Sequence, residues 1–97
     1  MRRFLTIFAA VVLSFGGTVF AAEAPPGATS CSGCHSAARG VDSPIPRLMG
    51  RDAPQLISAM QAFRSGQRPA TVMDRIAKGF TDDEIRAIAA WYAAQKD

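Results

Sequence analysis

The feature that most constrains this chain is a five-residue motif containing both of its cysteines and its only histidine. The motif reads Cys31-Ser32-Gly33-Cys34-His35. Two thiols at this spacing lie on one turn, where each can form a thioether bond to one vinyl group of a haem. The adjacent imidazole is then placed where a ring nitrogen reaches the iron. The motif therefore predicts one covalently bound haem c, attached through Cys31 and Cys34 and ligated by His35.

Three other uses of the same residues have to be weighed against haem attachment. A thioredoxin-type redox pair needs a strand before the cysteines and a long helix after them, whereas Pro25-Pro26-Gly27 precedes the motif and Arg39-Gly40 soon follows it. A structural zinc site needs four nitrogen or sulfur ligands, and the two cysteines and the histidine supply three. A disulfide suits an oxidising compartment but gives the histidine no role. Haem attachment uses all three side chains.

The first 21 residues have the three parts of a secretory signal peptide. Arg2-Arg3 forms the positive start, Phe4–Phe15 the apolar run, and Val19-Phe20-Ala21 the small residues of a cleavage site. We expect cleavage after this site, which leaves a haem domain of residues 22–97 in the periplasm. An uncleaved anchor is the alternative, because the apolar run extended through the following glycines is nearly long enough to span a bilayer.

Charge and size exclude several classes of protein. The whole chain has a formal net charge of +3, but loss of the signal peptide removes Arg2-Arg3 and leaves +1. Nucleic-acid binding needs a basic stripe on the folded domain, so we expect no nucleic acid partner, and no membrane contact after cleavage. About 76 residues form one small domain, near the limit at which an unaided apolar core suffices. The haem would supply part of that core.

The second ligand of the haem iron is predicted to be a methionine, because the chain has no second histidine. Met60 falls on the apolar stripe of a predicted helix, which is typical of core packing. Met49 follows His35 too closely for a helix to intervene and build an opposite wall. Met73 lies on a loop between two predicted helices, and His/Met ligation is usual in electron-carrying c haems. We therefore predict Met73 as the ligand, with Met60 as the alternative.

The pattern of apolar residues predicts an all-α domain with three main helices around the haem and a short N-terminal helix. No alternating strand pattern occurs in residues 22–97. The first expected element is a short helix from about Pro26 through the motif. A helix over Ala53–Arg64 follows, between an Asp52 N-cap and Gly66, and then a short helical turn from Met73 through Ile76 that stops at Gly79. The final helix starts at the capping box Thr81–Glu84, and its apolar face is Ile85, Ile88, Ala89 and Tyr92.

Beyond these patterns, the chain resembles a class I cytochrome c over essentially all of residues 22–97. The resemblance is carried by C-S-G-C-H, by I-P-R-L-M-G at 45–50, by F-R-S-G-Q-R, by the T-V-M loop and by the C-terminal G-F-T-D-D-E-I-R-A-I-A-A-W-Y-A-A-Q. It implies that the carbonyl of Pro46 accepts a hydrogen bond from His35, which would orient the ring and raise its basicity towards iron. It also implies that Arg68 faces a haem propionate, the alternative being a solvated surface arginine.

One departure from the family concerns the segment before the motif. Class I cytochromes have a fuller first helix packed on the last one, whereas here only residues 22–30 are available. We expect a reduced contact, with the aromatic pair Trp91-Tyr92 or another subunit covering the gap.

The block M-D-R-I-A-K-G-F-T-D-D-E-I is most similar to the haem subunit of flavocytochrome c sulfide dehydrogenase. That resemblance implies an FAD-containing partner that takes electrons from sulfide and passes them to this haem. A soluble cytochrome or another one-electron carrier would then accept them. The alternative is a freestanding periplasmic carrier of the c4 or c553 kind. Ligand sensing or peroxidase chemistry would need an open iron position, which His/Met ligation closes, so the domain is not expected to be catalytic alone.

Overall fold

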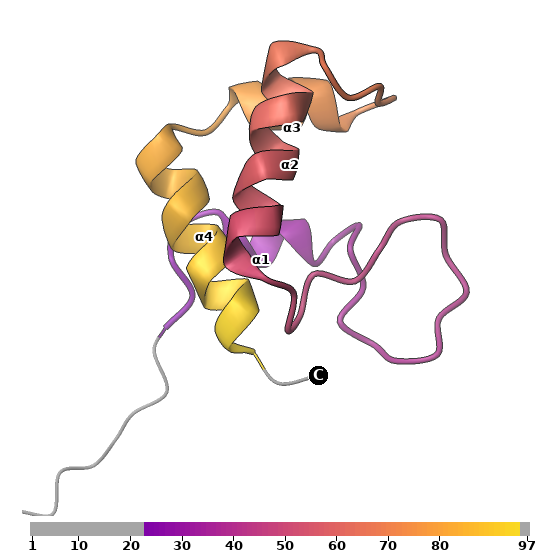
Figure 1. Cartoon of the computed structure of the whole chain (residues 1–97). Helices are drawn as coiled ribbons and strands as arrows, with labels where there is room; N and C mark the ends of the chain where they lie inside the picture. The colour runs from indigo at the N-terminus through magenta and orange to yellow at the C-terminus, as the bar shows by residue number, and fades with distance from the viewer. Residues whose placement is uncertain (1–22, 96–97) are drawn as a thin grey trace, which may run out of the picture.

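The structure, a computed structural model, describes residues 23–95. Within this range the chain forms four helices and no strands. They are α1 (Ala28–Cys31), α2 (Ala53–Ser65), α3 (Met73–Lys78) and α4 (Asp82–Ala94) (Figure 1). The all-α prediction is confirmed. The predicted signal peptide, residues 1–21, lies outside the described residues.

Local caps determine where α2 begins and ends. The backbone N–H of Gln55 donates to the side chain of Asp52 at 3.4 Å, and a proline occupies the first turn, where it does not interrupt helical hydrogen bonds. Gly66 ends the helix in the left-handed conformation, with φ 79°. Both predicted caps are confirmed, and the helix extends one residue further than predicted, to Ser65.

Helix α4 begins with the predicted capping box. The N–H of Glu84 donates to Thr81 Oγ1 at 3.2 Å, and the N–H of Thr81 donates to Glu84 Oε1 at 3.0 Å. Along the predicted apolar face, Ile85, Ala89 and Tyr92 are buried and Ile88 is half-buried. This face is the side of α4 that packs against the rest of the domain.

Helix α1 is shorter than predicted, because Gly27 adopts a left-handed conformation with φ 86° and stands just before the first helical residue. Only four residues are helical, so a single side chain makes much of the contact with α4. The hydroxyl of Tyr92 donates to the carbonyl of Ala28 at 2.5 Å and also bonds the hydroxyl of Ser32 at 3.0 Å. Of the pair Trp91-Tyr92, the tyrosine therefore contacts the short first helix directly.

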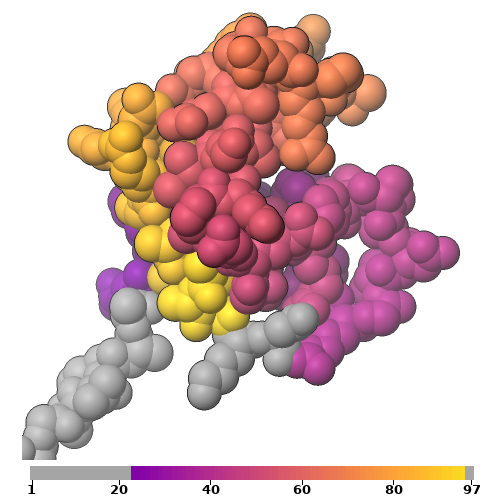
Figure 2. Space-filling view, viewed as in Figure 1, coloured from indigo at the N-terminus to yellow at the C-terminus, as the bar shows by residue number. Residues whose placement is uncertain are grey.

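Helix α2 packs against both α3 and α4. Ala77 of α3 is fully buried against its neighbours, and α3 ends at Gly79 as predicted. The loop between α1 and α2 stands off the helical body as an open ring (Figures 1 and 2). No helix within residues 23–95 is long and apolar enough to cross a membrane.

Candidate haem site

The helices and their connecting loops enclose a cavity of about 720 Å³. Residues from all four helices line it, and apolar side chains form most of its wall, among them Leu48, Leu56, Phe63, Phe80, Ile85 and Ile88. A cavity of this size and apolar character is typical of a cofactor site.

All three side chains of the predicted attachment motif line this cavity. Cys31 is the last residue of α1, and the chain then turns so that the N–H of His35 donates to the carbonyl of Cys31 at 2.8 Å. Both cysteines are free thiols; that of Cys31 is half-buried and that of Cys34 is exposed. Burial raises the pKa of the Cys31 thiol above its ordinary value, although hydrogen bonds to the backbone and to Tyr92 oppose this.

The ring of His35 is oriented by the loop that follows it. Its Nδ1 lies 2.6 Å from the carbonyl oxygen of Pro46. A carbonyl can only accept, so Nδ1 carries the proton and Nε2 keeps the lone pair that a metal ligand needs. The next residue, Arg47, donates from Nη2 to the carbonyl of Ala37 at 2.8 Å. Two contacts therefore close the loop of residues 35–47 at its base.

Two of the three candidate methionines line the cavity. Met60 reaches it from the middle of α2, and Met73 from the first residue of α3, directly after the exposed loop 69–72. Met49 does not line it. The structure thus brings together the attachment motif, Met60 and Met73, the two methionines between which the sequence analysis had to choose.

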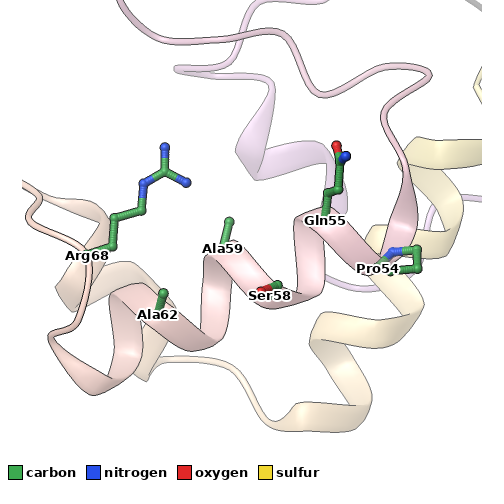
Figure 3. A pocket seen from close by; sticks show the side chains of 6 residues that line it. All are labelled: Pro54, Gln55, Ser58, Ala59, Ala62 and Arg68. Carbon is green, nitrogen blue, oxygen red and sulfur yellow. The ribbon is translucent and has the colours of Figure 1, made fainter.

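Two arginines, Arg51 and Arg68, line the cavity wall. Both are cationic, which suits the two propionates of a haem. Arg68 is exposed. Its guanidinium lies over the Phe63 ring, 4.8 Å from the centroid, and its side chain extends beside the face of α2 formed by Ala59 and Ala62 (Figure 3).

Arg51 was not identified as a site residue from the sequence. It stands one position before the helix cap Asp52, where nothing in the local pattern distinguishes it from a solvated arginine. Only the packing of the loop against α2 shows that it lines the cavity.

The residues present fit a haem. The cavity joins an apolar wall, two thiols, an imidazole with a free ring nitrogen, thioether sulfurs and cations, which are the groups that hold an attached c haem. Residues 23–95 contain no cluster of three or more His, Cys, Asp or Glu side chains that could hold a metal ion.

Comparisons with known proteins point to the same group. No family model matches the chain. It is 40% identical over 63 residues to the cytochrome subunit of sulfide dehydrogenase from Chlorobaculum tepidum, covering 65% of this chain and 57% of that protein. It is 33% identical over 99 residues to the thiosulfate dehydrogenase electron acceptor of Thiomonas intermedia, covering 99% of this chain and 45% of that protein. The chain thus spans about half the length of these two relatives.

A third relative is similar in size to the chain itself. Cytochrome c-554(548) from Halomonas halodenitrificans is 37% identical over 71 residues, which are 69% of this chain and 86% of that cytochrome. Because the similarity extends over nearly all of a cytochrome and the chain's own Cys-x-x-Cys-His motif lines the cavity, the chain belongs to the class I c-type cytochromes, electron-transfer proteins that bind haem c covalently.

Proposed function

We propose that this chain is a periplasmic electron-transfer protein whose haem iron is ligated by Nε2 of His35 and the sulfur of Met73. The observation that carries the proposal is the shared cavity lined by Cys31, Cys34, His35 and Met73. When bound, haem c supplies a one-electron Fe(III)/Fe(II) couple. Ligation by both His35 and Met73 would leave no position on the iron for a substrate.

The chain's own residues would hold and insulate this couple. The carbonyl of Pro46 keeps the proton on Nδ1 of His35, which leaves Nε2 basic towards the metal. With haem in place, the apolar wall would keep water from it and so favour the less charged, reduced state. Arg51 and Arg68 would neutralise the two propionates. We propose Arg68 as the first propionate partner because its side chain already lies along the cavity rim.

The partner we propose is an FAD-containing sulfide dehydrogenase subunit. The similarity to the cytochrome subunit from Chlorobaculum tepidum supports this assignment. Oxidation of sulfide releases electrons in pairs, whereas this haem accepts one at a time. The flavin would therefore divide the pair, and a soluble cytochrome or other one-electron carrier would reoxidise the haem. Two relatives named as electron acceptors of thiosulfate dehydrogenase make a thiosulfate-oxidising partner the control to include.

A second candidate function is that of a freestanding periplasmic carrier of the c4 or c553 kind. It is favoured by the similarity to cytochrome c-554(548), which covers 86% of that relative and so matches a protein of one-domain size. The ligation and the one-electron chemistry would be the same. The two functions differ in whether a large partner surface stays bound to the domain.

Both functions place the domain outside the cytoplasm. We propose that residues 1–21 are a signal peptide and that residues 22–97 form the haem domain. Mass determination of the haem protein from the periplasm tests this, because cleavage after Ala21 gives a chain that starts at Ala22. A mass that includes residues 1–21 would instead identify an anchor.

The visible spectrum of the protein, purified at its native size from the periplasm of its own host, separates the two functions. Spectra are taken before and after adding sulfide, with thiosulfate as the matched donor. Flavin absorption in a complex much larger than this domain, with haem reduced by sulfide, is the result expected for the subunit. A lone haem c protein that is inert to both donors until an enzyme is added would identify a free carrier.

A further inference from the structure

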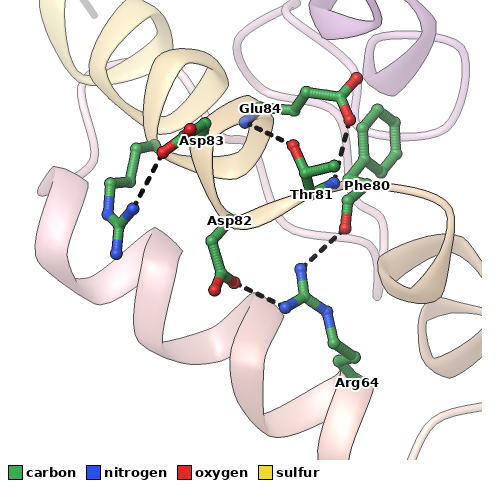
Figure 4. Close-up of polar contacts among 7 residues, drawn as sticks. Arg64, Phe80, Thr81, Asp82, Asp83 and Glu84 are labelled. Atoms are coloured by element: carbon green, nitrogen blue, oxygen red, sulfur yellow. Dashed lines mark hydrogen bonds and ion pairs between the residues drawn. The ribbon is translucent and has the colours of Figure 1, made fainter.

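Arg64, in the last turn of α2, connects α2 to the junction between α3 and α4. Its Nη1 lies 2.6 Å from Asp82 Oδ1, and its Nη2 donates to the carbonyl of Phe80 at 2.8 Å (Figure 4). The Arg64 side chain is 29% exposed. One guanidinium therefore holds a backbone group before α4 and a carboxylate at its first residue. A planar fork of donors can do this, whereas an ammonium group cannot bond both acceptors in the same way.

These contacts hold the segment that carries Met73. Helix α3 has six residues, and its N-cap, Val72, makes no side-chain hydrogen bond. A helix of this length is not stable by itself. Within the described part of the chain, the hydrogen bonds of residues 69–79 are local to that segment. The polar contacts that tie it to another element lie just outside it, at Arg68 on one side and at Phe80 and Asp82 on the other.

Phe80 connects the Arg64 contact to α3. Its N–H donates to the carbonyl of Ala77 at 3.4 Å and so continues the hydrogen bonds of α3, while its own carbonyl accepts from Arg64. At the other end of the segment, the N–H of Arg68 donates to the carbonyl of Ala62 at 3.1 Å. The Met73 segment is thus attached to α2 at both ends, and only the attachment at Arg64 is charge-assisted.

We propose that Arg64 is a positioning residue for the methionine ligand, and that its contacts with Phe80 and Asp82 set how often the Met73 sulfur leaves the iron. This inference rests on the proposed ligation by Met73. It assigns to Arg64 a role on the ligand side of the cavity, although the Arg64 side chain does not line that cavity.

The test compares variants of the ferric holoprotein. Excess imidazole replaces a methionine ligand at a rate limited by dissociation of the sulfur, so its binding rate measures the opening of the Met73 segment. We expect Arg64→Met to bind imidazole about tenfold faster than the wild type, from the loss of two charge-assisted bonds. Arg64→Lys, which keeps the charge but not the fork, is expected to fall in between. The sulfur-to-iron charge-transfer band should disappear at a lower temperature in Arg64→Met.

Two control variants separate positioning from other effects. Arg86→Met removes an exposed arginine that pairs with Asp83 at 3.2 Å within α4, and it should bind imidazole at the wild-type rate. Asp52→Ala removes the cap at the far end of α2, which lowers global stability without touching the Met73 segment.

The inference is overturned if Arg64→Met binds imidazole no faster than Arg86→Met, or if Asp52→Ala accelerates binding equally at the same unfolding free energy. A wrong assignment of Met73 as the ligand gives a different result. If Met73→Ala retains the charge-transfer band, then Met73 is not the ligand, and both the ligation and the role of Arg64 are wrong. If Met73→Ala loses the band while Arg64→Met behaves like Arg86→Met, the ligation stands and only the inference fails.

Discussion

At the scale of single residues, the main question is which of two methionines ligates the iron. Met60 lies within a helix capped at both ends, by Asp52 and Gly66, so its backbone has little freedom to adjust to a metal. Met73 begins a short helix after an exposed loop, so its position can adjust when the sulfur binds. This difference favours Met73, although both side chains line the cavity.

We expect Met73→Ala to lose the sulfur-to-iron charge-transfer band while the haem stays attached through Cys31 and Cys34. The reason is that the thioether bonds do not depend on the axial ligand. Absorption spectra of the ferric protein measure the band, and the mass of the denatured protein reports attachment. Met60→Leu is the matched control and should keep the band. Loss of the band in Met60→Leu alone would assign the ligand to Met60.

A second prediction at this scale concerns Gly27. A Cβ added there would lie 2.7 Å from Cε1 of the Phe80 ring, and φ is +86°. We expect Gly27→Ala to lower the free energy of unfolding by about 1–2 kcal/mol from the left-handed backbone, and by about 1–3 kcal/mol more from the clash. Denaturant unfolding of the holoprotein measures the sum.

Gly40→Ala is the control for the Gly27 prediction, because Gly40 has φ +72° and open space around its Cβ position. It should show the backbone cost alone. Equal losses of stability in the two variants would mean that the Phe80 ring moves aside without cost, and would remove the steric part of the argument.

At the scale of the helices, features set by neighbouring residues were predicted from the sequence, and features set by packing were not. Asp52, Gly66 and the Thr81–Glu84 box cap helices through contacts three residues apart, so the local sequence alone identifies them. Arg64 and Arg51 look like ordinary helix-flanking arginines in the sequence. Their contacts, with Phe80 and Asp82 and at the cavity wall, exist only once α2 has packed.

The features of the haem site also fall into those set by neighbouring residues and those set by packing. The spacing of the motif is local and could be predicted, whereas the choice between Met60 and Met73 depends on which side of the cavity each helix reaches. The contact of α1 with α4 shows both cases at once. The short first helix follows from Pro25, Pro26 and Gly27, but the bond from Tyr92 to the carbonyl of Ala28 is a result of tertiary packing.

Two carboxyl groups at the start of α4, those of Asp82 and Glu84, make the folding stability of the domain depend on pH in acid. A hydrogen bond and the charge of Arg64 hold the pKa of Asp82 below its ordinary value of 3.8. Hydrogen bonds within the capping box hold the pKa of Glu84 below 4.5. At pH values near these pKa values, the folded state therefore binds fewer protons than the unfolded state. The stabilisation from these contacts is present at pH values above the two ordinary pKa values, and it is lost as the pH falls through the two lowered pKa values.

We expect the double variant Asp82→Asn with Glu84→Gln to weaken the acid dependence of the unfolding free energy of the holoprotein. The side-chain amide introduced by Glu84→Gln can still complete the capping box, so stability at neutral pH should fall mainly through loss of the Arg64–Asp82 ion pair. Denaturant unfolding from about pH 3 to pH 7 measures the difference. Curves for wild type and variant that stay parallel down to the lowest pH would contradict the assignment.

At the scale of the whole molecule, the chain surrounds a cavity and has only a small core of its own. The buried apolar residues within residues 23–95 are Ala28, Ala77, Ile85, Ala89 and Tyr92, three of them alanines. Most of the larger apolar side chains, the buried Ile85 among them, line the 720 Å³ cavity. A domain of this size is already marginal on surface-to-volume grounds, so contact with the haem must provide much of the apolar burial that holds the helices together.

We therefore expect residues 22–97, produced without haem and kept reduced, to lose most of their fixed tertiary structure. An empty apolar cavity costs free energy that this small core cannot offset, and α3 is too short to persist alone. Loss of a cooperative thermal transition in circular dichroism and of amide dispersion in NMR spectra would show this. The Met73→Ala holoprotein is the control, because it keeps the haem and should retain both signals. A haem-free chain that unfolded cooperatively near the holoprotein's midpoint would instead mean that the contacts of α2 with α3 and α4 and the bond from Tyr92 to Ala28 suffice, and that the haem occupies a fold already formed.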